Sequence, residues 1–255
     1  RFLIMDKMIH TALNTLNNIH MNRSVKSQNL SNINVPGFRR DLGTSFSAGF
    51  LEQMDQFPSR VFALHEGANI FSAKPGNLKS TGQETDLAIK GQGFFITQPK
   101  SGEPSLSRRG DLGVSSDGFL TNGAGAQMLD LNQAPIAVPP FRKLIVSETG
   151  EMFIEPLGSD EGTRVALGTL ATTSGSETPM KKDIDGEIRL VGGGVPAPDQ
   201  NSTIAQSFLE ESNVNAVEEL VDTLSQQRQF EINVKFISLS KDMDEGSAGL
   251  MRMPN

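Results

Sequence analysis

Asn29-Leu30-Ser31-Asn32, followed by Val35-Pro36-Gly37-Phe38, marks the point where a long helical pattern ends and a glycine-rich pattern begins. Pro36 has no backbone N–H and disfavours the helical conformation of the residue before it. Gly37 tolerates the left-handed backbone region, which commonly follows the end of a helix. The stretch therefore predicts that a helix from about residue 5 to about Leu30 ends here in a fixed elbow. We expect the Asn29 and Asn32 amides to hydrogen-bond across subunits in a helix bundle and fix its register.

The sequence before this elbow carries apolar residues at alternating spacings of three and four, which is the pattern of one helix face. These residues are Phe2, Met5, Ile9, Ala12, Leu16, Ile19, Leu30 and Ile33. Arg23 and Lys26 interrupt this apolar seam with charge. A two-stranded coiled coil tolerates such breaks poorly, so we expect this helix to pack among several neighbours.

A second apolar seam lies near the end of the sequence. Its residues are Val214, Val217, Val221, Leu224, Phe230, Val234 and Ile237. Asn215, with Glu218 three residues later, predicts the N-cap of a C-terminal helix, and Asn213 lies just before it. The apolar spacing slips between Leu224 and Phe230, which we interpret as local overwinding or a change of packing partner. The two terminal helices are predicted to form one coiled-coil-like helical domain.

The sequence between the helices alternates short β patterns with turn signals. The expected strands flank Gly91-Gln92-Gly93, Asp117-Gly118, Thr149-Gly150 and Asp185-Gly186. Because no helix-length pattern interrupts them, we predict an α+β fold with a central antiparallel β domain of the barrel or sandwich kind. The predicted organisation is an N-terminal helix over 1–36, a connector over 37–83, the β domain over 84–204 and the C-terminal helix over 205–255.

Composition excludes several classes of function. The net charge of −7 disfavours nucleic acid as a partner, since phosphate binding needs clustered Lys and Arg. The nearest basic clusters are the doublets Arg39-Arg40 and Arg108-Arg109, which we interpret as solvated surface. The chain has no Cys, which excludes disulfides and thiolate chemistry. No apolar run of about 18 residues and no secretory leader is visible, so we expect no direct membrane insertion and no cleaved signal peptide.

The residues offer no convincing catalytic or metal site. His10 and His20 are ten residues apart on the predicted helix, which does not match the spacing of a zinc pair. The stretch from Lys182 to Gly186 lacks the bidentate Glu of a calcium loop, and a hairpin turn explains it. Gly91-Gln92-Gly93 precedes a strand pattern rather than a helix, so it does not predict a phosphate site. We therefore expect no enzyme, no metal and no cofactor.

The stretch from Asn29 to Arg39 resembles the signature of the axial proteins of the bacterial flagellum, the rod and hook family. In that family a terminal helix ends in Asn-Leu-x-Asn, followed by a Pro-Gly-Phe turn and a basic residue. Residues 211–220 and 229–231 are similar to the family's C-terminal helix entry. Residues 85–95 and Arg109-Gly110 resemble its β domain. Met5–Ala12 is more similar to a proximal rod subunit than to a distal rod or hook subunit.

The resemblance implies a structural subunit of the flagellar rod that polymerises helically with rod subunits of the same and neighbouring kinds. It further implies export by the flagellar type III apparatus, an inner tube of terminal helices under an outer layer of β domains, and a rod that crosses the periplasm and transmits torque. The expected elbow and assembly residues are Asn29, Leu30, Asn32, Pro36, Gly37, Phe38, Asn213 and Asn215. The expected seam residues are Ile9, Leu16, Ile19, Val217, Val221, Leu224, Phe230, Val234 and Ile237.

Two alternatives stay open at this point. The first is a distal rod or hook-type axial subunit, which would share the elbow and the β domain. The second belongs to another class, a secreted carbohydrate-active β domain with helical anchors. It would require two carboxylates that converge in a cleft, one of them with a raised pKa.

Overall fold

A computed structural model of the chain describes residues 2–43, 70–175, 179–183 and 185–251. These residues divide into two compact units. The helical unit takes its described residues from 2–30, 42–43 and 215–251. The β unit takes its described residues from 31–41, 70–175, 179–183 and 185–214.

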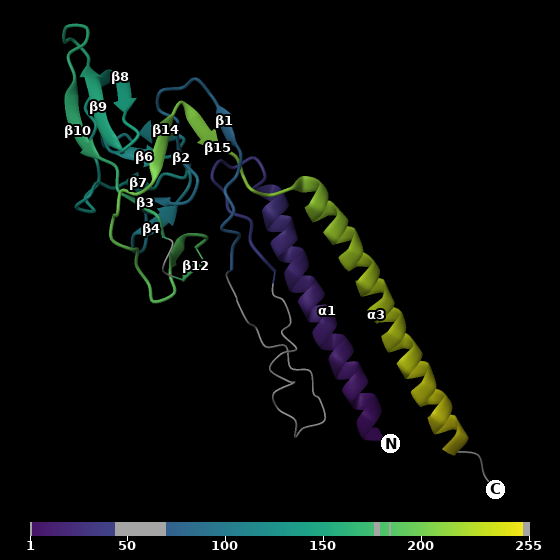
Figure 1. Cartoon of the computed structure of the whole chain (residues 1–255). Helices are drawn as coiled ribbons and strands as arrows, with labels where there is room; N and C mark the ends of the chain where they lie inside the picture. The colour runs from purple at the N-terminus through teal and green to yellow at the C-terminus, as the bar shows by residue number, and fades with distance from the viewer. Residues whose placement is uncertain (1, 44–69, 176–178, 184, 252–255) are drawn as a thin grey trace. The chain divides into compact units, whose positions relative to one another are not determined.

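The helical unit contains helix α1, Phe2–Ser31, and helix α3, Ala216–Met251. The two helices run side by side in opposite directions, so that later residues of α1 lie beside earlier residues of α3 (Figure 1). Over the described residues, neither helix has the length of apolar sequence that a membrane crossing requires. Helix α1 ends at Ser31, close to the end near Leu30 that the sequence predicted.

The facing ends of the two helices follow from local hydrogen bonds. After α1, the Val35 N–H donates to the Asn32 carbonyl at 3.1 Å. Gly37 then adopts a φ of 68°, in the left-handed region that glycine accepts readily. Before α3, the Asn215 side-chain oxygen accepts the N–H groups of Val217 and Glu218 at 3.0 and 3.3 Å. This is the N-cap that the sequence predicted, and it satisfies two amides that have no partner within the helix.

The β unit is built entirely of antiparallel strand pairs within the described residues. The strands are β1 (Leu78–Ser80), β2 (Leu87–Lys90), β3 (Phe94–Gln98), β4 (Ser105–Ser107), β5 (Leu112–Val114), β6 (Leu120–Asn122), β7 (Gln127–Met128), β8 (Phe141–Val146), β9 (Glu151–Pro156), β10 (Val165–Thr169), β11 (Thr172–Thr173), β12 (Met180–Lys182), β13 (Ile188–Leu190), β14 (Thr203–Gln206) and β15 (Phe208–Glu210). The largest sheet has the order β12-β13-β4-β3-β7-β6-β5, with β11 also paired to β3. A second sheet has the order β10-β9-β8, and the pairs β14-β2 and β1-β15 complete the unit.

Strand β3 is central to the core because it is buried on both faces. Phe95 belongs to one apolar cluster, together with residues of β2, β6, β8, β9 and β14. Phe94 and Ile96 point to the opposite side and belong to a second cluster with Leu106 and Ile188. Successive side chains of a strand alternate between faces, so a run of apolar residues requires packing on both sides.

The expected hairpins at Asp117-Gly118, Thr149-Gly150 and Asp185-Gly186 are confirmed by the pairs β5-β6, β8-β9 and β12-β13. The barrel alternative is wrong, since the described strands close no barrel. Turn signals identify neighbouring strands but carry no information on whether the outermost strands meet. The predicted connector, residues 37–83, includes 44–69, which lie outside the described residues.

Candidate functional site

The chain enters and leaves the β unit through two segments that lie side by side. The Gly37 N–H donates to the Glu210 carbonyl at 2.7 Å, and the Asn213 N–H donates to the Phe38 carbonyl at 3.3 Å. The Asn213 side-chain oxygen accepts the Arg40 N–H at 2.6 Å. We call these two segments, residues 37–41 and 208–214, the junction. Gly37, Phe38 and Asn213, expected from the sequence to form an elbow, meet here.

Gly37 is required at the junction for two separate reasons. Its φ of 68° disfavours residues that carry a Cβ. A Cβ at this position would also lie 2.6 Å from the Arg109 nitrogen, and closer still to the Arg108 carbonyl group. Those atoms belong to the backbone and cannot rotate away, so only glycine allows the two segments to approach so closely.

A buried ion cluster lies beneath the junction and consists of Arg39, Arg108 and Glu210. Arg108 Nε donates to Glu210 Oε2 at 2.6 Å, and Arg39 Nη2 lies 3.1 Å from Glu210 Oε1. Arg39 and Arg108 are only 3% and 2% exposed. Arg108 also donates to the carbonyl oxygens of residues 89, 91 and 93 at 3.2, 2.6 and 2.7 Å. Arg39 donates to the Lys74 carbonyl and lies over the Phe94 ring.

The ion cluster holds two positive charges against one negative charge. Burial lowers the pKa of Arg39 to about 10, because desolvation outweighs the attraction of Glu210 and because Arg108 repels it. Burial likewise lowers the pKa of Arg108 from its ordinary value, although Glu210 opposes this change. Arg39 Nε has no hydrogen-bond partner within the described part of the chain. Among the residues that the structure describes, Glu210 is the carboxylate that pairs with both guanidinium groups.

Residues 37–41, the entry segment through which the chain enters the β unit, have a second anchor beside the ion cluster. Lys182 Nζ lies 4.1 Å from the centre of the Phe38 ring and 2.7 Å from Asp41 Oδ1. It also donates to the Arg39 carbonyl at 3.3 Å. A cation over an aromatic face is attracted by the ring's quadrupole. Lys182 therefore holds both the Phe38 ring and the backbone of residues 37–41.

The interpretation of the basic doublets as solvated surface is wrong. One arginine of each doublet, Arg39 and Arg108, is buried against Glu210, while Arg40 and Arg109 remain partly exposed. Sequence reasoning also missed Glu210 and Lys182 as functional residues. The three members of the ion cluster are far apart in sequence and follow no local spacing, so only the tertiary fold shows that they meet.

The helical unit holds α1 against α3 with polar contacts near the elbow. Lys26 Nζ lies 2.6 Å from Asp222 Oδ2 and 3.2 Å from Glu219 Oε2. The fully buried Asn29 donates its side-chain N–H to Glu219 Oε1 at 3.4 Å. Such buried polar pairs are costly to misalign, so they favour one register between the helices. The interruption of the N-terminal seam at Lys26 is therefore a contact with α3.

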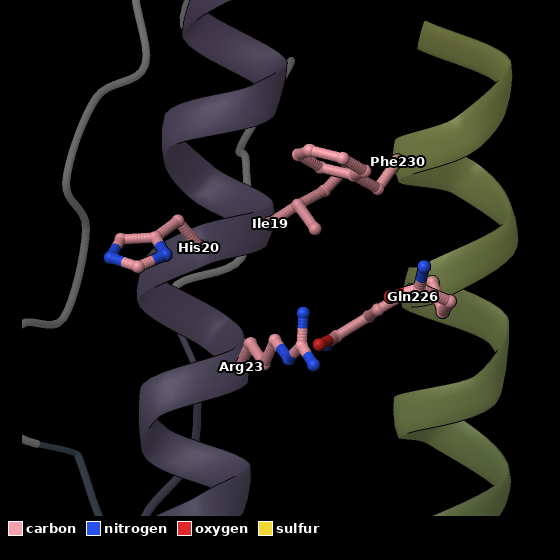
Figure 2. A pocket seen from close by; sticks show the side chains of 6 residues that line it. Ile19, His20, Arg23, Gln226 and Phe230 are labelled. Atoms are coloured by element: carbon pink, nitrogen blue, oxygen red, sulfur yellow. The ribbon is translucent and has the colours of Figure 1, made fainter. Parts of the chain in front are cut away.

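A small pocket lies further along the same helix pair, as Figure 2 shows. Ile19 and Phe230 form its apolar side, and Arg23 and Gln226 point toward each other across it. Its volume is about 40 Å³, which suits a water molecule or the tip of a side chain. His20 lines the rim and points away from α3 (Figure 2). The pocket is too small for a metabolite-sized ligand.

Helix α3 has an inner face toward α1 and an opposite outer face. The inner seam is less exposed and consists of Glu219, Thr223, Gln226, Phe230, Asn233, Ile237 and Ser240. The outer stripe is mostly apolar and exposed, with Arg228 and Lys235 on the same face between its apolar members. The apolar members are Val217, Val221, Leu224, Ile232, Leu239 and Met243. Val217, Val221 and Leu224 are 70%, 55% and 63% exposed.

The predicted C-terminal seam combined residues from these two faces. Phe230 follows Leu224 by six residues. Because each residue of a helix turns about 100°, the two side chains lie about 120° apart around the helix. Helix α3 is continuous from Ala216 to Met251, and its inner seam keeps spacings of three and four throughout. The burial pattern therefore supports a change of packing partner at the slip rather than overwinding.

The remaining expected residues occupy varied environments. Ile19 is buried, Leu16, Asn32, Pro36 and Ile237 are partly buried, and Leu30, Asn215 and Val234 are exposed. Ile9 belongs to α1, but its side chain lies outside the described part of the chain. The coiled-coil-like packing is not confirmed, because several of the expected seam residues have no partner helix within the described chain.

The described residues contain no group of three or more His, Asp or Glu side chains that could hold a metal ion. The carboxylates with a resolved pKa change, Glu148, Asp185 and Asp199, all have pKa values below the ordinary range. None of them has the raised pKa that a general acid requires. The organised features of the described chain are instead the junction, the ion cluster and the two faces of α3.

Two family models match the chain. Residues 88–154 match the model described as the flagellar hook protein FlgE/F/G D1 domain. Residues 205–250 match the model described as flagellar basal body rod FlgEFG protein C-terminal. The first match covers β2 to most of β9, and the second covers the last strands and almost all of α3. Both descriptions place the chain among flagellar rod and hook proteins.

Whole-chain relatives agree with these matches. The flagellar basal-body rod protein FlgF of Salmonella typhimurium is 28% identical over 250 residues, which is 96% of this chain and 97% of the relative. FlgF of Escherichia coli is 29% identical over 252 residues, with the same shares of each chain. FlgG of Buchnera aphidicola subsp. Schizaphis graminum is 30% identical over 241 residues, which is 88% of this chain and 91% of the relative.

The chain therefore belongs to the flagellar basal-body rod protein family. It is a structural subunit of the flagellar rod and not an enzyme.

Proposed function

We propose that the chain is a proximal rod subunit whose α3 outer stripe is covered by helices of neighbouring rod subunits. The observation that carries this proposal is the exposure of Val217, Val221 and Leu224 on a face directed away from α1. Fully burying a Val or Leu side chain contributes about 1.5–3 kcal/mol relative to leaving it exposed. An apolar stripe along a long helix therefore favours association with another helix.

The proximal assignment rests on the extent of the similarity. The two FlgF relatives above span 96% of this chain, whereas the FlgG relative above spans 88% at nearly the same identity. The similarity of Met5–Ala12 to proximal subunits points in the same direction. The distal rod or hook-type alternative remains the closest competitor, and it would use the same outer stripe.

We also propose an export route and a location within the rod, on the basis of the resemblance to the rod and hook family. The subunit is exported through the flagellar type III apparatus, and it joins the part of the rod that crosses the periplasm. There, partner subunits of the same and neighbouring kinds cover its terminal helices, and the junction joins those helices to the β unit. The elbow residues Asn29, Asn32 and Pro36 and the helix cap at Asn215 fix where the helices end.

A matched pair of substitutions tests this proposal. Leu224→Ser changes a residue of the outer stripe that is 63% exposed, whereas Leu157→Ser changes a residue of the β unit that is 66% exposed. Both variants should leave the urea midpoint of the purified chain nearly unchanged, because exposed substitutions usually alter stability by less than about 0.5 kcal/mol. In cells that carry only the variant, L224S should reduce the number of complete rods seen by electron microscopy, and L157S should not. Equal rod numbers for the two variants would contradict the proposal.

A further inference from the structure

The last part of the β unit makes an unusual range of contacts for its length. We call residues 203–213 the closing segment. Its strand β14 pairs with β2 over four residues, and β15 pairs with β1 over three. Gln206 accepts the Val146 N–H at 3.1 Å and donates to the Leu144 carbonyl at 2.7 Å, so it hydrogen-bonds the free edge of β8. The closing segment thus contacts strands from the beginning and the middle of the β unit.

The closing segment also brings the counter-charge of the ion cluster. Arg39 and Arg108 come from the beginning and the middle of the chain, and Glu210 comes from near its end. Without Glu210, two buried guanidinium groups would face each other with no carboxylate between them. The carbonyl oxygens around Arg108 satisfy its N–H groups but carry no net charge. A buried charge without a partner is strongly destabilising.

We propose that the closing segment controls when the β unit folds, because the ion cluster is compensated only after Glu210 has taken its place. A chain that emerges from its N-terminus first presents both arginines long before this carboxylate. The β unit therefore stays open until residues 203–213 are present, and then closes in one cooperative step. This inference concerns folding and holds whether or not the chain assembles as proposed above. The idea that the closing segment delays folding during export rests on the proposed function.

The first test compares Glu210→Gln with Glu148→Gln in the full chain by hydrogen exchange with mass spectrometry. Glu148 pairs with Lys90 at 2.8 Å on the exposed surface, so E148Q removes an ion pair without uncovering a buried charge. E210Q should lower the folding equilibrium constant by roughly 10²- to 10⁴-fold. Protection of amide hydrogens should fall throughout the β unit, including β9, whose paired strands β8 and β10 contain no member of the ion cluster. Loss confined to β1, β15 and residues 37–41 would overturn the proposal.

Charge-balanced variants separate missing counter-charge from general loss of packing. E210Q raises the net charge of the cluster by one, whereas the double variant Arg39→Met with E210Q restores the original net charge. Protection in β3 and β9 should therefore be higher in the double variant than in E210Q alone. Arg39→Met alone leaves Arg108 paired with Glu210 and should do less damage than E210Q. A double variant as unprotected as E210Q would overturn the charge argument, even if E210Q itself never folds.

Refolding of the unmodified chain tests the order of events. In pulse-labelled hydrogen exchange, β3, β9 and β15 should gain protection in the same kinetic phase. Protection of β3 and β9 in an earlier phase than β15 would show that the unit closes without the closing segment, and the proposal would be wrong. None of these folding experiments requires assembly of the rod, so a failed rod assay and a failed folding assay remain distinguishable.

Discussion

Gly37→Ala should destabilise the β unit more than an alanine at another glycine with the same backbone conformation. Gly37 has a φ of 68°, and Gly82 has a φ of 72°. A Cβ at Gly82 would meet nothing within 4 Å, whereas at Gly37 it would press on the backbone of Arg108 and Arg109. The two positions therefore share the cost of the left-handed conformation and differ only in the steric clash at the junction.

The expected magnitudes follow from these two contributions. The left-handed conformation of a residue with a Cβ costs roughly 1–2 kcal/mol. Forcing an extra carbon into a packed site costs typically about 1–3 kcal/mol more, because neighbouring backbone must move. Gly82→Ala should therefore lower the free energy of unfolding by about 1–2 kcal/mol. Gly37→Ala should lower it by about 2–5 kcal/mol.

Urea unfolding of the purified chain, followed by far-UV circular dichroism, measures both changes. The sequence contains no Trp or Tyr, so backbone ellipticity is a better probe than intrinsic fluorescence. Equal destabilisation by the two alanines would refute the reasoning, because it would mean that the entry segment moves away from Arg108 at no cost. A larger effect at Gly82 would refute it as well.

Two further predictions concern the helix start and the response to acid. Asn215→Ala removes the acceptor for the first amides of α3 and should cost about 1 kcal/mol. Far-UV circular dichroism should then show reduced helix content on mild heating, and an unchanged melting curve would contradict the cap. Partial burial alone would raise the pKa of Asp199, but hydrogen bonds from Ser174 and Asn201 prevail and hold it below its ordinary value. Because the folded pKa is depressed, this stabilisation is present above the unfolded pKa of about 3.9 and is lost as pH falls through the folded pKa. Asp199→Asn should therefore flatten the dependence of the urea midpoint on pH in that acid range, and an unchanged slope would contradict the assignment.

Much of the local structure could be predicted from the sequence. The end of α1 shortly before Pro36-Gly37, the cap at Asn215 and three hairpins follow from residues that act on their own neighbours. Such signals depend on backbone geometry alone, so they need no knowledge of the fold. Sheet order is different, because β14 pairs with β2 and β15 with β1 across most of the β unit.

The ion cluster could not be predicted for the same reason. A charged residue in a loop pattern is usually solvated, and Arg39 and Arg108 look like ordinary surface residues in sequence. Their burial depends on Glu210, which the sequence separates from both. A sequence pattern can therefore show where the elbow lies, but the groups that fix it appear only once strands far apart in the chain have paired.

The two faces of α3 explain why one heptad pattern does not describe this helix. Its inner seam toward α1 includes Glu219, Gln226 and Asn233, whereas its outer face is mostly apolar and is interrupted by Arg228 and Lys235. The helix thus uses its more polar side within the chain and exposes its more apolar side. Since burial of apolar surface is the larger source of stability, covering the outer stripe should contribute more than the contact with α1. We propose that helices of another chain provide this cover. The helical unit should therefore gain most of its stability on assembly, because α3 carries one seam toward α1 and a second set of apolar residues on its outer face.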